Sequence, residues 1–159
     1  MTNQNAILPA IALRGTTILP GMIVHFDVSR ERSKKAIEAA MLHDQKIFLV
    51  TQIDPEVENP DVSGVYRVGT IGYIKQVVKL PQDILRVLVE GTGRAVLEDF
   101  QQDFPYLTGV ISPVKEEETL LPDTVTEAMY RSLKELFHRY CMENGKVSKE
   151  LVSQILNIE

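Results

Sequence analysis

Residues 68–90 read VGTIGYIKQVVKL-PQD-ILRVLVE, and this stretch decides the fold. Both flanks are rich in strand-forming residues, whereas the middle segment Pro81-Gln82-Asp83 has the length and composition of a turn. We therefore predict a β-hairpin in which a strand over residues 68–80 is joined to a strand over residues 84–90.

Glycines interrupt or follow these two runs. Inside a strand, glycine often marks a bulge or a close backbone approach at a sharp bend of the sheet. The pattern predicts a small curved sheet or a partly closed barrel, with bends near Gly69, Gly72, Gly91 and Gly93.

The rest of residues 7–114 also reads mainly as strands. Over residues 23–28 polarity alternates, so that Val24, Phe26 and Val28 share one face and His25 and Asp27 the other. Residues 46–51 form a continuous apolar run, which indicates a strand buried on both faces, and residues 107–114 supply another strand. One helix interrupts the series. We expect Ser29 as its N-cap and an apolar stripe of Ile37, Ala40 and Met41.

The pattern changes at the charged run 115–118. We predict a β-rich domain over residues 1–114, a charged linker over 115–122, and the start of a helical region over 123–159 that is truncated in mid-pattern. A first helix ends at Asn144-Gly145 and a second begins at Ser148. The apolar stripe of the first is Val125, Met129, Leu133, Leu136, Phe137 and Tyr140. Such a stripe could pack against a second copy of the chain.

Composition places limits on function. The chain of 159 residues has a net charge of −5, which does not favour phosphate backbones. The single cysteine, Cys141, cannot form an internal disulfide and suits a reducing compartment. We see no signal peptide and no apolar run long enough to cross a membrane, so we expect a cytoplasmic protein.

Catalytic patterns are weak. His25, His43 and His138 lack the spacing of paired metal ligands, and no phosphate loop or nucleophile elbow is present. The acidic residues between positions 54 and 61 do not match a calcium loop and read as a solvated loop. We predict neither a metal site nor a catalytic site.

Short signatures along the chain carry a family resemblance. They are Leu13-Arg14-Gly15, Leu19-Pro20-Gly21-Met22, Arg30-Glu31-Arg32-Ser33, Ile47-Phe48-Leu49-Val50-Thr51-Gln52, Tyr66-Arg67-Val68-Gly69-Thr70, Ile74-Lys75-Gln76, Lys79-Leu80-Pro81, Val87-Leu88-Val89-Glu90-Gly91 and Gly93-Arg94-Ala95. In this order the chain resembles the amino-terminal domain of the ATP-dependent Lon protease family, over residues 7–114 and more loosely beyond.

The resemblance implies an α+β fold: a β-rich, barrel-like (PUA-like) domain with one inserted helix, followed by a helical extension. It implies a non-catalytic domain of a serine protease that recognises unfolded, damaged or degron-bearing proteins and helps to organise a homohexameric ring. ATP and Mg²⁺ would belong to the ATPase module of the parent protein, and this domain would need no cofactor.

The best candidates for substrate contact are apolar residues in loops, because exposed apolar groups there are costly unless they bind something. These are Ile18, Leu19, Pro20 and Met22 between two strands, and Leu80 and Pro81 at the hairpin turn. Packing of part of this set in the core is the competing interpretation. Arg14, Arg94 and Glu90 are interpreted as structural ion pairs at the edge of the barrel.

Two other functions stay open. One is a stand-alone adaptor built on the same domain, and the other is an RNA-binding barrel domain. The acidic net charge and the absence of interleaved aromatic and basic residues argue against RNA.

Overall fold

The computed structural model describes residues 5–114 and 124–157. The chain divides into two compact units, Met1–Lys115 and Glu116–Glu159, and each is described by itself. The charged linker predicted over residues 115–122 lies outside the described residues.

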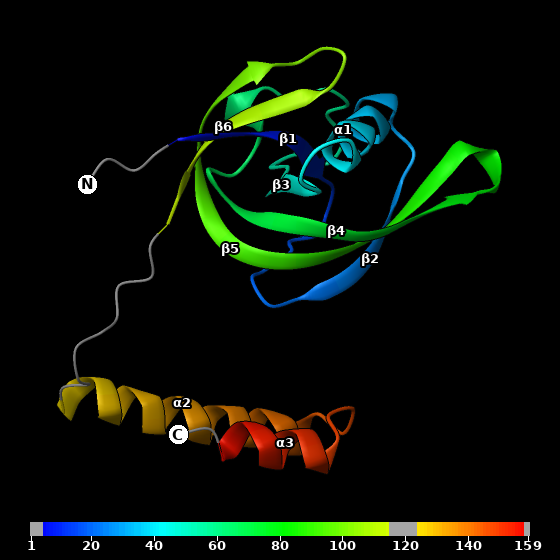
Figure 1. The fold of residues 1–159 in the computed structure, drawn as a ribbon. Helices are drawn as coiled ribbons and strands as arrows, with labels where there is room; N and C mark the ends of the chain where they lie inside the picture. The colour runs from blue at the N-terminus through cyan, green and yellow to red at the C-terminus, as the bar shows by residue number, and fades with distance from the viewer. Residues whose placement is uncertain (1–4, 115–123, 158–159) are drawn as a thin grey trace. The chain divides into compact units, whose positions relative to one another are not determined.

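Residues 5–114, the described part of the first unit, form six strands and one α-helix, arranged as Figure 1 shows. The strands are β1 (Ala6–Leu13), β2 (Ile23–Val28), β3 (Lys46–Thr51), β4 (Val68–Leu80), β5 (Ile84–Gln102) and β6 (Leu107–Pro113), and the helix is α1 (Glu31–Met41). Short 3₁₀ turns lie at Val62–Gly64 and Pro81–Asp83.

The sheet has the strand order β2-β5-β4-β3-β1-β6, and β6 also pairs with β5. The pairings therefore run from β5 through β4, β3, β1 and β6 back to β5. Only β1 and β3 are parallel, and the other pairs are antiparallel. This arrangement confirms the predicted α+β fold, a β-rich domain with one inserted helix.

The hairpin of β4 and β5 projects from the body of the sheet (Figure 1), and its turn falls where the sequence predicts it. Strand β5, however, extends to Gln102, whereas the prediction ended it at residue 90. The strand changes partners along its length, pairing first with β2 and then with β6. The pairing register of β5 shifts opposite Ile71 of β4 and again after Leu97. Such shifts break the alternation of side chains, so the sequence pattern does not reveal that β5 continues past residue 90.

Two apolar clusters form the core, and β3 contributes to both. Ile47 and Leu49 belong to a cluster with Ile37 of α1, whereas Phe48 and Val50 belong to a cluster with Leu97 and Ile111. Successive side chains of a strand point to opposite faces, so β3 is buried on both sides, as predicted.

Helix α1 packs against β1 and β3. The prediction of Ser29 as its N-cap is wrong: Arg30 is the cap residue, in an extended conformation, and its side chain makes no capping hydrogen bond. Helical geometry begins at Glu31 because the segment after β2 stays extended for one more residue. Ile37 and Ala40 are buried as predicted, but Met41 is exposed because it lies in the last turn, past the core contact.

The second unit contains α2 (Thr124–Glu143) and α3 (Lys149–Leu156), which contact each other. Ser148 caps α3, since its hydroxyl accepts a hydrogen bond from the Leu151 amide at 3.2 Å. Cys141 is buried, whereas five residues of the predicted stripe are exposed: Val125, Met129, Leu133, Leu136 and Tyr140.

Candidate functional site

The loop between β1 and β2 carries most of the predicted contact residues, and the structure separates them into buried and exposed ones. Ile18 is 4% exposed and belongs to the core, so its side chain is not on the surface. Its carbonyl accepts a hydrogen bond from the buried Thr70 hydroxyl at 2.6 Å. Ile18 therefore holds the loop against the sheet.

The next four residues form a tight turn. The Met22 amide donates to the Leu19 carbonyl at 3.2 Å, and Gly21 has φ +81°. A proline followed by a glycine with positive φ is typical of a type II turn. The Leu19 amide also donates to the Met22 sulfur at 3.3 Å, so the side chain of Met22 folds back over the turn.

Main-chain hydrogen bonds join this turn to β5. The Gly21 amide donates to the Gly91 carbonyl, and the Gly91 amide donates to the Met22 carbonyl, both at 2.8 Å. A Cβ atom at Gly91 would lie 2.4 Å from the Leu19 carbonyl oxygen. Glycine is therefore required at residue 91 by the close approach of the loop.

The side chains that this turn exposes are apolar. Leu19 is 50% exposed, Met22 36% and Ile23, the first residue of β2, 62%, whereas Pro20 is half-buried. We call Leu19, Met22 and Ile23 the apolar loop surface. Ile23 was not among the predicted contact residues, although the alternation over residues 23–28 places it on the solvent face with His25.

The other predicted contact residues lie at the tip of the β4–β5 hairpin, residues 80–83. Pro81 is exposed and Leu80 is half-buried. Glu90 pairs with Ile23 and Ile84 pairs with Leu80, six positions apart on β5 (90 − 84). At about 3.4 Å per residue, the two groups of residues are separated by about 20 Å. The structure thus does not join them in one site.

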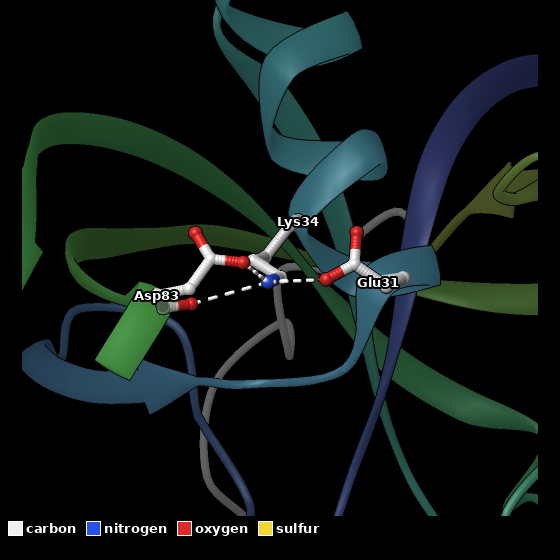
Figure 2. A network of polar contacts seen from close by, with 3 residues as sticks. All are labelled: Glu31, Lys34 and Asp83. Carbon is white, nitrogen blue, oxygen red and sulfur yellow. Dashed lines mark hydrogen bonds and ion pairs between the residues drawn. The ribbon is translucent and has the colours of Figure 1, made fainter.

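Lys34 of α1 holds the hairpin tip (Figure 2). Its ammonium group forms ion pairs with Asp83 and Glu31 and donates to the Asp83 carbonyl at 3.1 Å. The side chain of Lys34 is only 9% exposed. Its hydrogen bonds to Asp83 and then to Glu31 raise the pKa of Lys34, and the bond to Lys34 lowers the pKa of the Asp83 carboxyl.

The ion pairs at the sheet edge differ from the predicted ones. Glu90 pairs with Lys75 at 2.5 Å, and neither Arg14 nor Arg94 forms an ion pair within residues 5–114 and 124–157. Glu90 and Lys75 lie on neighbouring strands, where cross-strand pairing brings them together. The hydrogen bond to Glu90 raises the pKa of Lys75.

The acidic loop has a structural role in part. Asp61 accepts hydrogen bonds from the amides of Ser63 at 2.9 Å and Gly64 at 3.1 Å, and the Ser63 hydroxyl also bonds to it. These bonds lower the pKa of Asp61. Among the described residues, no three His, Cys, Asp or Glu side chains are grouped to hold a metal ion. Neither described helix of the second unit, nor α1, is long and apolar enough to span a membrane.

Comparison with known proteins gives a consistent answer. Residues 7–159 match the family described as the ATP-dependent protease La (LON) substrate-binding domain. The chain is 45% identical over 155 residues to the Lon protease of Lachnoclostridium phytofermentans, covering 98% of this chain and 19% of that protein. It is 38% identical over 159 residues to the Lon protease of Clostridium acetobutylicum, covering all of this chain and 20% of that protein. The chain thus spans about one fifth of the length of these curated relatives.

Solved structures resemble it in fold. The N-terminal domain of Mycobacterium avium complex Lon protease superposes with a TM-score of 0.73 at 18% identity, covering 96% of this chain and 76% of that one. A Lon N-terminal domain protein from Xanthomonas campestris gives a TM-score of 0.60 at 14% identity, over 96% and 90% of the two chains. The family matched is a binding domain and accounts for nearly all of the sequence, in agreement with the prediction that this chain is not itself an enzyme.

Proposed function

This chain belongs to the family of the Lon substrate-binding domain, and from that premise we propose that it captures unfolded, damaged or degron-bearing proteins for an ATP-dependent protease. The observation that carries the proposal is the apolar loop surface. Leu19, Met22 and Ile23 stay exposed although main-chain hydrogen bonds to Gly91 fix the turn that presents them. Apolar groups held rigidly at the surface lose little entropy when a partner covers them.

The size of this surface favours weak and unselective binding. Fully burying an apolar side chain contributes about 1.5–3 kcal/mol, so three half-exposed ones supply on the order of 3 kcal/mol. A single copy would therefore bind in the millimolar range or weaker. The polarisable and flexible side chain of Met22 suits partners of varied shape.

We propose the hairpin tip as a second contact for the same bound chain. An extended polypeptide of about six residues spans roughly 20 Å, the separation of the two surfaces along β5. Pro81 and the half-buried Leu80 would then add to the contacts at the apolar loop surface. Residues 1–114 would form this binding domain, with the linker and helical region connecting it to the rest of the protease.

The properties of the longer protein follow as proposals. We infer a cytoplasmic homohexamer in which ATP and Mg²⁺ serve the ATPase module and this domain binds no cofactor. Six linked copies would raise a weak affinity by a factor of about 10² to 10⁴ where geometry allows several contacts at once. We do not expect nucleic acid to bind this domain, because the net charge of −5 opposes it.

Binding of a permanently unfolded protein tests the proposal. Fluorescence anisotropy of a labelled, reduced and alkylated protein should increase when the wild-type chain is added. The labelled folded, disulfide-intact form of the same protein should show no such increase. The variant carrying Leu19→Ser, Met22→Ser and Ile23→Ser should bind at least tenfold more weakly. Leu42→Ser is the matched control, because Leu42 is 83% exposed outside this surface. Equal binding by all variants would contradict the assignment of the apolar loop surface as the binding site for unfolded protein.

A further inference from the structure

A polar pocket lies at the N-terminus of α1, apart from the apolar loop surface. Its walls are residues 11–13 of β1, Arg14, residues 26–28 of β2 and the start of α1. A second pocket at the helix start is bounded by Asn59 and Leu107, and Ala12, Arg30 and Ser33 line both pockets. We call these two adjoining pockets the α1 pocket.

The helix start facing the α1 pocket has no side-chain cap. The first amides of a helix have no acceptor within the helix. The cap residue, Arg30, makes no capping hydrogen bond, and its guanidinium instead donates to the buried Gln52 at 3.0 Å. The amides of the first turn, together with the partial positive charge of the helix dipole, are therefore free to face an anion.

Two polar side-chain groups at this helix start have no hydrogen-bond partner among the described residues, and one of them, the Nε atom of Arg32, is fully buried. Ser33 is 9% exposed, and its hydroxyl makes no hydrogen bond to any residue within 5–114 or 124–157. The Nε atom of Arg32 is buried without a partner among the same residues, although its NH1 group donates to Asn59 at 2.6 Å. Buried polar groups are normally satisfied, so these donors are suited to a ligand.

The charges around the α1 pocket favour an anion of low charge. Arg14 and Arg30 line it, and Arg14 forms no ion pair in the described part of the chain. Asp27 also lines the pocket, but its carboxylate is paired with Arg86 at 2.7 Å. Glu31 is paired with Lys34, and Glu58, which lines the far side, forms no ion pair with any residue that the structure describes. A planar carboxylate with one charge fits this balance better than a phosphate.

We propose that the α1 pocket binds a carboxylate of a polypeptide, held by the first-turn amides of α1, the Ser33 hydroxyl and the guanidinium groups of Arg14 and Arg30. This inference rests on the proposed function, because it names a chemical group that a captured chain would present. The carboxylate comes from the C-terminus of that chain or from an acidic side chain, and the two sources share the same chemistry.

Amide-resolved NMR titration of the full chain tests the inference with four probes at low salt. They are an N-acetylated Gly/Ser peptide with a free C-terminus, the same peptide as a C-terminal amide, the amidated peptide with one internal Asp, and inorganic phosphate. We expect the free-terminus peptide, the Asp peptide or both to shift the amides of Glu31, Arg32 and Ser33, and the neutral peptide to leave them unchanged. Whichever carboxylate peptide shifts them identifies the source.

Variants distinguish a specific carboxylate site from general attraction to positive charge. Arg14→Gln and Ser33→Ala should each raise the dissociation constant of the carboxylate peptide at least threefold. Arg131→Gln, which removes the same charge from α2, should leave it unchanged. The inference is overturned if the neutral peptide shifts the same amides equally, if only phosphate does so, or if Arg131→Gln weakens binding as much as Arg14→Gln.

The result is distinguishable from a failure of the proposed function. If unfolded protein binds the apolar loop surface while no carboxylate peptide shifts α1, the carboxylate site alone is wrong. If the carboxylate peptides bind and unfolded protein does not, the α1 pocket stands and capture through Leu19, Met22 and Ile23 is wrong.

Discussion

The apolar loop surface and the hairpin tip lie near opposite ends of the paired strands β2 and β5, but different interactions hold them in place. The loop is held by main-chain hydrogen bonds to Gly91 and by the buried bond from Thr70 to Ile18. The tip, where Gln82 and Asp83 have positive φ, is held by the charged side chain of Lys34. The first surface should therefore be insensitive to pH and salt, whereas the second should respond to both.

Gly91→Ala should give the largest effect on this comparison. The new Cβ would lie 2.4 Å from the Leu19 carbonyl oxygen, which is backbone and cannot move aside cheaply. We expect a loss of about 1–3 kcal/mol in the free energy of unfolding, measured by urea denaturation.

Gly93→Ala is the matched control two residues along β5, because a Cβ there would meet nothing within 4 Å. Its free energy of unfolding should stay within about 0.5 kcal/mol of the wild type. Equal destabilisation by both substitutions would contradict the close approach at Gly91 as the cause.

Thr70→Val should give a smaller loss in the free energy of unfolding. Valine keeps the shape of the buried side chain but leaves the Ile18 carbonyl without the donor that lies at 2.6 Å. We expect about 1–2 kcal/mol from urea denaturation, because an unsatisfied buried acceptor costs that much. The Thr92 hydroxyl donates to the Ile71 carbonyl at 2.9 Å in an exposed position. Thr92→Val should therefore cost clearly less, and equal costs would argue against burial as the cause.

Local sequence patterns predicted part of the fold, and contacts between residues far apart in the sequence decided the rest. Alternation predicted β2, a continuous apolar run predicted β3, and strand-forming residues with a turn segment predicted β4 and the hairpin turn, because those features are local. The extension of β5 past residue 90 depends on its exchange of β2 for β6 as partner, which no local pattern records. The same holds for Ile18: its place in a loop suggested exposure, but the bond from Thr70, 52 positions away, places it in the core.

The candidate contact residues were predicted in two loops, and the structure places these loops on two separate surfaces. Leu19 and Met22 lie on one surface because one turn contains both. Pairing along β5 sets the distance to Leu80 and Pro81, and that register was not predictable. The α1 pocket was also missed, since Ser29 rather than Arg30 was expected to cap the helix.

Lys34→Met should release the hairpin tip without affecting the loop. The pKa of Asp83 lies below its ordinary value of 3.8 because of Lys34, so the substitution should raise it toward that value. NMR titration of the Asp83 carboxyl carbon measures this change. The pKa of Asp27, lowered by its bond to Arg86, should not move and serves as the internal control.

The pH dependence of the tip follows from the same shifts. The lowered pKa of Asp83 means that this contact contributes fully above about pH 4 and is lost as the pH falls through the folded-state value. The raised pKa of Lys34 means that it contributes fully below about pH 10 and is lost as the pH rises through the folded-state value. The protection factors of the amides at residues 82–84, which correct for the intrinsic pH dependence of hydrogen exchange, should therefore fall at acid pH before those of Leu19, Gly21 and Met22 do.

High salt should give the smallest effect, and it should again affect the hairpin tip and not the apolar loop surface. At about 1 M salt the screening length falls to roughly 3 Å, which weakens contacts of exposed charges such as Asp83. We expect a modest acceleration of exchange at the hairpin tip and none at the turn joined to Gly91. Uniform acceleration at both surfaces would show that they do not differ in this way.

The measurement that tests the central claim most directly is an amide-resolved NMR titration of the full chain with a permanently unfolded protein, with its folded form as the control. We predict that the largest shifts fall on residues 19–23, with smaller shifts at residues 80–83 and none from the folded form. Shifts at residues 80–83 alone, or none at near-millimolar concentration, would contradict capture of unfolded chains by the apolar loop surface.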